Sequence, residues 1–297
     1  MADKKEILKI TSPIKNQMNT FEIKLKEIIS KDKNFLFNHL ENFMFSNQKR
    51  LRPLFTFLFS EILKINSDFT LKIALITELI HSSSLIHDDI IDCDKLRRNQ
   101  ETFNYKFNSK IAVLEGDFLL ALALELLSET TLEINKIFAK RIKKTIQGEI
   151  KQNEFSNKVL DLDEYYTKTF EKTGNLFFCG LEALFSLKKI DEKLKENLLS
   201  FLKNYCLAFQ IKNDLENFLT NKTDLQNGNY TLPVIYFCLE NKKEELDFSK
   251  CDFTKYIEKS KQKIEELKEC SIKFLDEIEN SPYRNSLIEL TKYTLRS

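Results

Sequence analysis

Two aspartates at the end of an apolar stretch are the first residues in this sequence that could do chemistry. Asp88 and Asp92 lie four residues apart, so a helix would place both carboxylates on one face. They would repel each other there, and the negative pole at the C-terminal end of the helix would add to the repulsion. Carboxylate oxygens suit Mg²⁺, which commonly takes one or two protein carboxylates and completes its coordination with phosphate and water. An isolated pair of this kind usually only ends a helix in solvent.

Basic residues on both sides of the aspartates change that interpretation. Arg97 and Arg98 follow closely in the chain, and Lys49 and Arg52 lie upstream. Arginine presents a planar fork that suits phosphate oxygens, and lysine adds a point charge. Either basic cluster alone would be typical of a solvated surface. Together with a carboxylate pair that can gather a metal, the two clusters predict a site for a diphosphate.

The elements that must position these residues are predicted to be helices. The 297 residues include only 5 Gly and 4 Pro, where average composition would give roughly 20 Gly. Gly and Pro punctuate turns, so their scarcity indicates long helices joined by short loops. The sequence shows no internal repeat and no linker rich in Pro, Gly or Ser. We therefore expect an all-α chain that forms a single domain over residues 1–297.

Apolar spacing locates the individual helices. The expected helices cover residues 16–46, 50–64, 70–93, 109–128, 132–155, 163–186, 192–220 and 230–241, with more polar, outer helices within 252–295. The helix over 70–93 is apolar on nearly all sides, which predicts a position in the middle of a bundle. The helix over 109–128 has too few polar residues to face water, so it should pack inside the bundle or between two chains.

Composition excludes several other classes of protein. The 46 basic and 45 acidic residues balance, so the basic excess typical of nucleic-acid binding is missing. The six cysteines are scattered without a CxxC pair, which predicts reduced thiols in a cytoplasmic protein rather than a zinc site. The N-terminus lacks the apolar core of a signal peptide. No window approaches ~18 uncharged apolar residues, so we expect no membrane span.

Seven motifs, in consistent order from about residue 40 to Arg296, resemble the boxes of the trans-isoprenyl diphosphate synthases, or polyprenyl synthetase family. They are KRLRP at 49–53, ELIHSSSLIHDDIIDCDKLRR at 78–98, VLEGDFLLALALELL at 113–127, IQGEIKQ at 146–152, KTGNLF at 172–177, AFQIKNDLEN at 208–217 and NGNYTLPVIY at 227–236. The resemblance implies the isoprenoid synthase type I fold, a bundle of roughly ten or more helices around a central apolar cavity. Within the family, the sequence looks like a long-chain type such as octaprenyl diphosphate synthase.

The resemblance also implies a reaction and a set of site residues. Members of the family condense an allylic diphosphate with isopentenyl diphosphate. By resemblance, Asp88, Asp92 and Asp214 bind Mg²⁺, and Asp89 supports the first motif. The residues implied for the allylic diphosphate are Arg97, Lys172, Thr173 and Gln210, and those implied for isopentenyl diphosphate are Lys49, Arg52, His81 and Arg98. A homodimer is expected, with the helix over 109–128 as its interface.

Product length is implied by the residues just before the first motif. In this family, bulky side chains one turn before the first aspartate block the growing tail, and here these positions are Ser83 and Ser84. Both are small, which favours a product longer than fifteen carbons. Deeper residues such as Ile80 or Ile76, or Phe side chains from neighbouring helices, would set the final length.

Departures from the family pattern leave two alternatives open. The three acids of the second aspartate-rich motif correspond to Asn213, Asp214 and Asn217, and an Asn supplies a carbonyl oxygen without charge. Other departures are Asn47-Gln48 and Asn99 where glycines are expected, and Asn229 where a basic residue is expected, with Lys222 as a candidate replacement cation. A non-catalytic or helper subunit of a heteromeric synthase is the first alternative. A terpene cyclase is the second, although the retained isopentenyl diphosphate residues argue against it.

Overall fold

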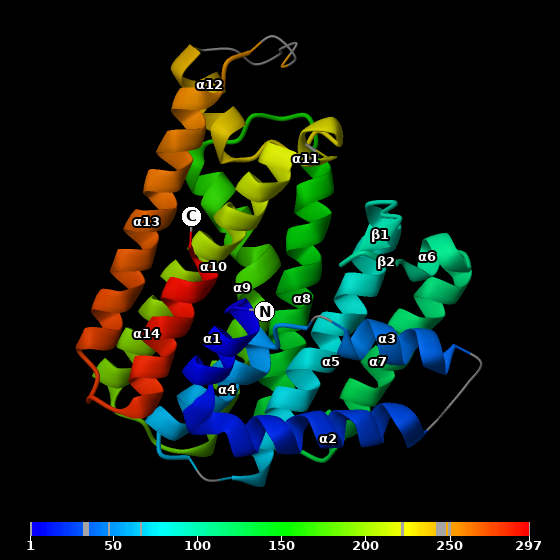
Figure 1. Ribbon diagram of the computed structural model, residues 1–297, viewed down its shortest axis with the longest axis vertical. Coiled ribbons are helices and arrows are strands. Elements are labelled where there is room, and N and C mark those ends of the chain that lie inside the picture. Colours follow the sequence, from blue (N-terminus) through cyan, green and yellow to red (C-terminus); the bar gives the residue numbers. More distant parts are fainter. Residues whose placement is uncertain are drawn as a thin grey trace. The chain divides into compact units, whose positions relative to one another are not determined.

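The computed structural model describes residues 2–31, 36–46, 48–65, 67–220, 223–241, 248 and 251–296 (Figure 1). These residues form fourteen α-helices, one short 3₁₀ helix and one two-stranded hairpin, which confirms the predicted all-α class. Contacts between Cα atoms divide the chain into two compact units. The C-terminal unit comprises residues 1–10, 139–178 and 190–297, and the N-terminal unit comprises 11–138 and 179–189. The single domain stays a prediction.

The N-terminal unit is built around one long buried helix. Its elements are the 3₁₀ helix η1 (Ser12–Ile14), α2 (Lys15–Lys31), α3 (Phe37–Phe45), α4 (Leu51–Ile62), α5 (Asp68–Ile91), β1 (Leu96–Arg97), β2 (Gln100–Glu101), α6 (Phe103–Lys106), α7 (Ser109–Ser128) and the start of α8 (Leu132–Glu154). The helix α5 packs against α4 and α7, as its apolar composition predicted. Ser67 begins it by accepting a hydrogen bond from the Phe69 amide, and Asn108 caps α7 in the same way through the Ile111 amide.

The helix α5 is long and mostly apolar. Among the described helices it alone is long and apolar enough to cross a membrane by length and composition. However, 67% of its most apolar window is buried inside the structure. Packing against α4 and α7 therefore explains this composition.

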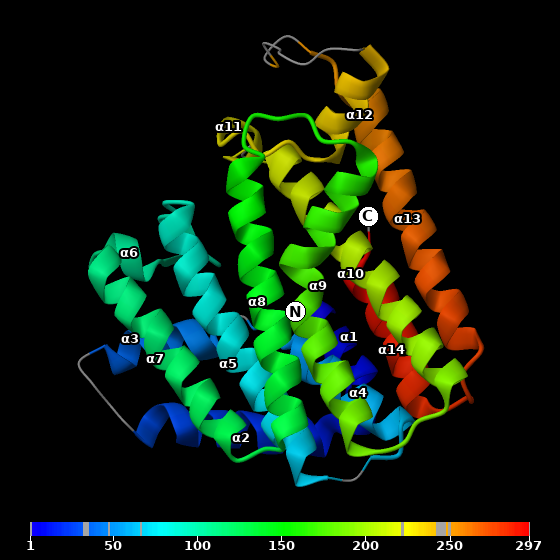
Figure 2. The same ribbon diagram turned by 180° about the vertical axis from the view of Figure 1, so that it is seen from behind.

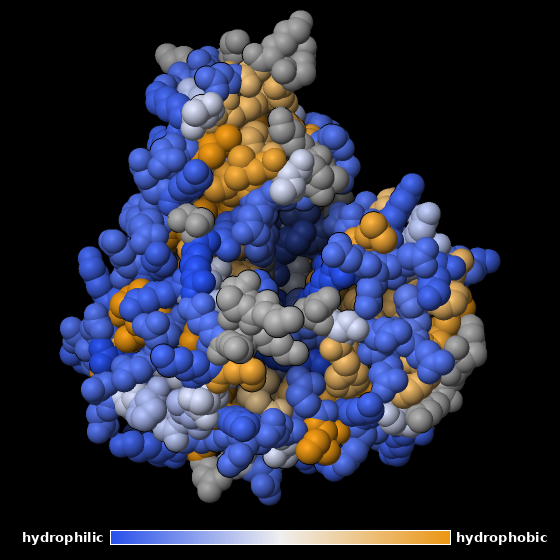
Figure 3. Space-filling model, in the orientation of Figure 1, coloured by the Kyte–Doolittle hydropathy of each residue, from blue (hydrophilic) through white to orange (hydrophobic). Residues whose placement is uncertain are grey.

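The C-terminal unit contains the remaining helices. They are α1 (Ala2–Ile10), most of α8, α9 (Leu162–Leu187) up to residue 178, α10 (Glu192–Thr220), α11 (Thr223–Gln226), α12 (Leu232–Asn241), α13 (Thr254–Asp276) and α14 (Pro282–Thr294). The helices α10 and α13 pack along each other, as both ribbon views show (Figures 1 and 2). Mostly hydrophilic side chains cover α13 and α14 on the face shown in Figure 3, which agrees with the outer position expected for residues 252–295.

One predicted helix was wrong. Residues 16–46 do not form a single helix but the two helices α2 and α3, and residues 32–35 between them lie outside the described part of the chain. The buried stripe of α2 ends at Ile29, and α3 buries a separate stripe through Leu40 and Met44. By contrast, α7 and α10 have the bounds that the apolar spacing predicted.

Candidate functional site

The C-terminal end of α5 carries the first two predicted metal ligands. Asp88 lies in the last turn and is partly buried, and Asp92 is the exposed C-cap residue. The Asp92 amide donates to the Asp88 carbonyl at 2.8 Å, so helical geometry continues through the pair and the two side chains share a face. No group of three or more His, Cys, Asp and Glu side chains in the described residues is arranged to hold a metal. Two carboxylates on one helix face fit a magnesium ion that also binds phosphate.

Asp89, between these two aspartates, has a different role. It is 1% exposed, and its Oδ1 accepts a hydrogen bond from Arg97 Nε at 2.6 Å. Burial raises the pKa of Asp89 to about 6, Arg97 acts in the opposite direction, and Asp94 and Asp92 add to the rise. The structure thus brings Asp89 to Arg97, where it orients the guanidinium.

A short hairpin holds Arg97 in this place. The strands β1 and β2 pair through Arg97 and Gln100, which leaves Arg98 and Asn99 as a two-residue turn. Their φ values are 54° and 64°, the left-handed region that a type I′ turn requires at both positions. Asn tolerates this region better than other residues with a side chain, which explains how Asn99 replaces the expected glycine. Sequence reasoning missed the hairpin because two-residue strands are too short to show alternation.

Asn104 is a second residue of this region that sequence reasoning missed. Its Nδ2 donates to the main-chain carbonyl of Asp89 at 3.0 Å and to that of Asp94 at 3.1 Å. Thr102 Oγ1 also donates to the Asp94 carbonyl, at 2.6 Å. The segment between the aspartates and the hairpin is therefore fixed by side chains that follow the hairpin.

His81 lies among the predicted basic residues of the same unit. Burial lowers the pKa of His81 well below its usual value, and the charges of Arg52, Arg98 and Arg97 lower it further. The imidazole is therefore neutral at neutral pH. The structure brings His81 close to Arg52 and Arg98, with which the resemblance groups it, and also to Arg97, whereas Lys49 is exposed just before α4.

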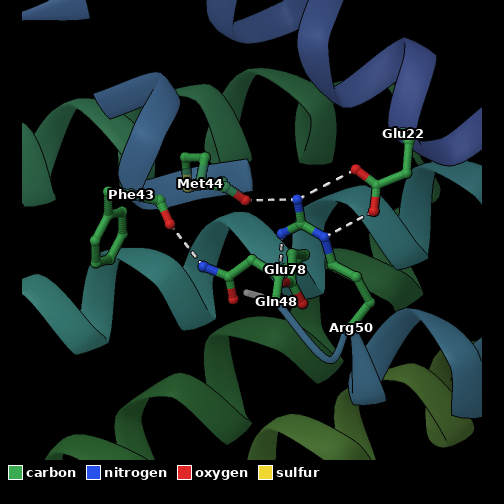
Figure 4. Close-up of polar contacts among 6 residues, drawn as sticks. All are labelled: Glu22, Phe43, Met44, Gln48, Arg50 and Glu78. Atoms are coloured by element: carbon green, nitrogen blue, oxygen red, sulfur yellow. Dashed lines mark hydrogen bonds and ion pairs between the residues drawn. The ribbon is translucent and has the colours of Figure 1, made fainter. Parts of the chain in front are cut away.

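Arg50, between Lys49 and Arg52, does not face solvent. Its guanidinium is 6% exposed and makes an ion pair with Glu78 of α5 at 2.8 Å (Figure 4). A second ion pair joins it to Glu22 of α2 at 2.9 Å, and its Nη2 donates to the Met44 carbonyl at 2.6 Å. Arg50 therefore links α2, α3 and α5 at the point where α4 begins. Asn47, one of the departures from the family pattern, lies outside the described residues.

The small serines before the aspartates pack closely against α7. Ser83 Oγ donates to the Gly116 carbonyl at 2.8 Å, and a Cβ atom added at Gly116 would lie 2.2 Å from His87 Nε2. Ser84 is partly buried and donates to the His81 carbonyl at 2.8 Å. Any larger residue at position 116 would therefore require the His87 ring to move.

A large cavity lies toward the other end of α5. It has a volume of about 940 Å³ and includes Leu71 and Leu75 of α5 and Leu122 of α7 in its lining. The deeper residues named from the sequence, Ile76 and Ile80, are buried but do not line it. Leu71 and Leu75 carried no motif, and only their place on the cavity side of α5 reveals them.

The other predicted residues lie in the C-terminal unit, and three of them form a hydrogen-bonded chain. Thr173 Oγ1 donates to Gln210 Oε1, and Gln210 Nε2 donates to Asp214 Oδ1 at 2.6 Å. Lys172 Nζ makes an ion pair with Glu149 at 3.2 Å and donates to Gln152 Oε1 at 3.3 Å. The structure thus brings Thr173, Gln210 and Asp214 together.

Asp214 is held by a second donor that the sequence did not reveal. The Tyr165 hydroxyl donates to Asp214 Oδ2 at 2.9 Å, and burial, then the Asp214 charge, raise the pKa of this phenol well above its usual value. Tyr165 therefore remains a neutral donor. Of the two asparagines in this motif, Asn213 is exposed and Asn217 Oδ1 accepts from the Asp224 amide at 3.2 Å.

The remaining residues that differ from the family pattern lie in different surroundings. Asn217, through its bond to the Asp224 amide, helps to hold the start of α11 in place. Lys222, the candidate replacement cation, lies outside the described residues. Asn229 accepts a hydrogen bond from the ammonium of Lys168, a residue that no motif included.

A small polar pocket of about 70 Å³ lies beside Asp214. Its lining residues are Gln152, Lys168, Thr169, Lys172, Gln210, Asp214, Asp224, Asn229, Tyr230 and Thr231. All of them belong to the C-terminal unit. The pocket therefore gathers predicted residues, such as Lys172 and Gln210, with several that sequence reasoning did not find.

Comparison with known sequences identifies the relatives of this chain. The family model described as polyprenyl synthetase matches residues 33–273. The chain is 31% identical to a prenyl transferase of Cyanophora paradoxa, with 97% of this chain and 98% of that protein covered. It is 30% identical to the chloroplastic solanesyl diphosphate synthase 2 of Arabidopsis thaliana, with 91% of this chain and 72% of that protein covered.

Solved structures of similar proteins have the same fold. The heptaprenyl diphosphate synthase of Staphylococcus aureus is 26% identical with a TM-score of 0.81, and 95% of this chain and 98% of that chain are covered. A polyprenyl synthase of Caulobacter crescentus, in complex with calcium and isoprenyl diphosphate, is 23% identical with a TM-score of 0.84 and 97% coverage of both chains. The fold implied by the seven motifs is confirmed. The chain belongs to the polyprenyl synthetase family of prenyltransferases.

Proposed function

We propose that this chain is a trans-polyprenyl diphosphate synthase that condenses isopentenyl diphosphate with an allylic diphosphate. The observation that carries the proposal is the end of α5, where Asp88 and Asp92 share a helix face and Asp89 holds Arg97 at 2.6 Å. His81, Arg52 and Arg98 lie on the same unit, so donors for phosphate oxygens accompany the carboxylates. The solanesyl diphosphate synthase among its relatives supports a product longer than fifteen carbons.

The chemistry of this reaction is mainly electrostatic. Asp88 and Asp92 hold Mg²⁺ in this proposal, and the ion, when bound, neutralises part of the charge of the diphosphate. Arg97 donates hydrogen bonds to the allylic diphosphate and stabilises the negative charge that develops as the C1–O bond breaks. Lys172 has the same role, because its ammonium is a second cation implied for this diphosphate. No nucleophilic Ser or Cys is needed.

The second substrate is positioned by a separate set of donors. Arg52, Arg98 and Lys49 bind the diphosphate of isopentenyl diphosphate, and the neutral imidazole of His81 adds a hydrogen bond without further charge. This fixes the double bond so that it attacks C1 of the allylic group as the C1–O bond breaks and inorganic diphosphate departs. The carbocation that results then loses a proton from C2 to the departing diphosphate, which forms the new double bond of the longer prenyl diphosphate. Fixed substrates account for much of the rate, because a reaction between two bound molecules avoids the entropy cost of encounter. Apolar surroundings exclude water from the allylic cation.

One assay separates this function from its alternatives. The purified chain is incubated with Mg²⁺, labelled isopentenyl diphosphate and a short allylic diphosphate, and the products are separated by chromatography. Labelled products longer than fifteen carbons support the proposal. Turnover that requires a second chain would instead support a helper subunit, and a cyclic hydrocarbon from the allylic diphosphate alone would support a terpene cyclase.

The proposed enzyme is a homodimer that associates through α7. One side of α7 packs on α5, and the other side exposes Val113, Leu114 and Leu124, with exposed fractions of 42%, 63% and 54%. Positions 114, 121 and 124 repeat at helical spacing, so these side chains lie along one stripe. An exposed apolar stripe of this kind is typical of a protein interface.

The proposed location is a reducing compartment such as the cytoplasm. The six cysteines, all of them described, form no disulfide with one another, and Cys93 is exposed. Disulfides are rare in reducing compartments, so this state agrees with the expectation from the sequence.

A further inference from the structure

The small polar pocket beside Asp214 contains a buried ammonium, that of Lys168, which has no carboxylate at ion-pair distance among the described residues. Lys168 is 8% exposed, and its Nζ donates to Asn229 Oδ1 at 3.3 Å and lies 5.8 Å from the centre of the Tyr165 ring. By contrast, the neighbouring Lys172 makes an ion pair with Glu149. Burial of a charge without a paired charge costs free energy, so an anion bound beside Lys168 would stabilise its ammonium.

The pKa of Lys168 shifts in the direction expected for a buried ammonium. Burial lowers the pKa of the ammonium, the charge of Asp214 acts in the opposite direction, and the charge of Lys172 lowers the pKa further. Both oxygens of Asp214 already accept hydrogen bonds, from Gln210 and Tyr165. Asp214 therefore affects Lys168 at longer range and does not pair with it directly.

A buried hydroxyl in the same pocket also lacks a partner. Thr231 is 5% exposed, and its Oγ1 has no hydrogen-bond partner among the described residues. A hydroxyl that is buried in this way loses its bonds to water without replacement. Lys168 and Thr231 therefore offer an ammonium and a hydroxyl to the same small space, and both groups can donate to the oxygens of a phosphate.

The pocket contains acids as well as bases. Asp214 and Asp224 line it together with the two lysines, and Gln152 and Gln210 add side-chain amides. The carboxylates disfavour a free anion, so a ligand must offer several acceptor oxygens to the donors at once. A terminal phosphate group has this chemistry, whereas a prenyl chain has no acceptor.

We infer that Lys168 and Thr231 bind a phosphate group of the diphosphate substrate or product in this pocket. The inference rests on the proposed function, because it names further residues of the diphosphate site. Lys168 also supplies the positive charge expected at position 229, since its ammonium lies beside the Asn229 side chain. The sequence departs from the family pattern at Asn229, and the charge enters the same pocket from α9 instead.

The test measures the binding of inorganic diphosphate to the full chain by isothermal titration calorimetry in the presence of Mg²⁺. The Lys168→Gln variant removes the charge, and we expect its Kd to rise at least tenfold. The double variant Lys168→Gln with Asn229→Lys returns the charge to the pocket from the other side, and its Kd should come back to within a few-fold of the wild type. Lys212→Gln is the matched control, because Lys212 pairs with Glu216 on α10 and lies outside the pocket.

A second variant keeps the test decisive if Lys168→Gln does not fold. Thr231→Val replaces an unpartnered hydroxyl with a methyl group, so the thermal unfolding midpoint should stay the same or rise. Its Kd for diphosphate should nevertheless increase several-fold. A purely structural role for Thr231 would leave the Kd unchanged.

The outcomes separate this inference from the proposed function. If the wild type binds no diphosphate, or if Lys168→Gln and Thr231→Val bind it as tightly as the wild type does, the inference is overturned. If diphosphate binding depends on Lys168 but the wild type makes no prenyl product in the assay above, the inference stands and the proposed function fails.

Discussion

Arg97 Nε lies 2.6 Å from Oδ1 of Asp89, and this pair joins strand β1 of a short hairpin to the end of α5. Asp89 is almost fully buried, while Arg97 keeps a quarter of its side chain exposed. The pair therefore presents a charged guanidinium from a fixed position beside Asp88 and Asp92. It also makes the stability of this region depend on pH, because burial raises the pKa of Asp89 to about 6.

The pH dependence of stability should change in Asp89→Asn. In metal-free protein between pH 4 and 6, the folded state binds a proton on Asp89 that the unfolded state has released. The free energy of unfolding contributed by this group therefore falls as pH rises through that window, by at most about 3 kcal/mol, and stays lower above it. Urea unfolding at pH 4, 5, 6 and 7 should show this slope in the wild type and a flatter one in Asp89→Asn. Equal slopes in both proteins would contradict the raised pKa.

Asp88→Asn should remove turnover without unfolding the chain. The substitution keeps the size of the side chain but removes the charge of one carboxylate at the end of α5. We expect kcat to fall by about 10²- to 10³-fold, with an unchanged circular dichroism spectrum. Asp163→Asn is the control, because Asp163 is exposed in the first turn of α9. Near-normal rates in Asp88→Asn would exclude the metal site.

Arg50→Gln should destabilise the chain strongly. It leaves Glu78, which is 2% exposed, without its cation, and loss of one partner from a buried pair costs about 3–5 kcal/mol. Lys24→Gln breaks an exposed pair with Glu27 and should cost less than about 1 kcal/mol. Urea unfolding measures both values. Similar small losses in the two variants would show that the buried network contributes little.

Arg50→Lys extends this test to function. A lysine retains the charge but cannot reach Glu22, Glu78 and the Met44 carbonyl together, because it lacks the planar fork. Where it still folds, KM for isopentenyl diphosphate should rise more than kcat falls, since the Lys49–Arg52 segment loses its fixed position.

The Ser84→Phe variant should make shorter prenyl products than the wild type. Ser84 is partly buried on α5, one turn before the aspartates, and a phenyl group there would block a tail that extends along the helix. Mass spectrometry of the products should show shorter chains than in the wild type. Ser84→Ala, which adds no bulk, should leave the distribution unchanged. An unaltered product in Ser84→Phe would mean that the tail takes another path.

Leu124→Glu should weaken the dimer. A charged side chain in the exposed stripe of α7 would have to be desolvated in the interface. Sedimentation velocity should show a monomer or a large rise in the dissociation constant. Leu239→Glu is the control, since Leu239 is also exposed (46%) but lies on α12. A wild-type monomer, or a variant that dimerises normally, would remove α7 from the interface.

Local patterns in the sequence were sufficient to predict several helices of this protein and part of its candidate site. The apolar spacing predicted α7 and α10 with their bounds, because helix periodicity depends on neighbouring residues. The spacing of Asp88 and Asp92 likewise predicted a shared helix face. Both statements depend on residues within a few turns of one another.

Only the tertiary structure decided which polar groups meet across the chain. In the sequence Arg50 is one more basic residue of the KRLRP motif, yet it is buried between Glu22 and Glu78, each 28 residues away. Lys168 carried no motif, yet it lies beside Asn229, 61 residues later. The physical reason is that a buried charge is defined by its partners in space, and contacts between distant segments leave no periodic signal in the sequence.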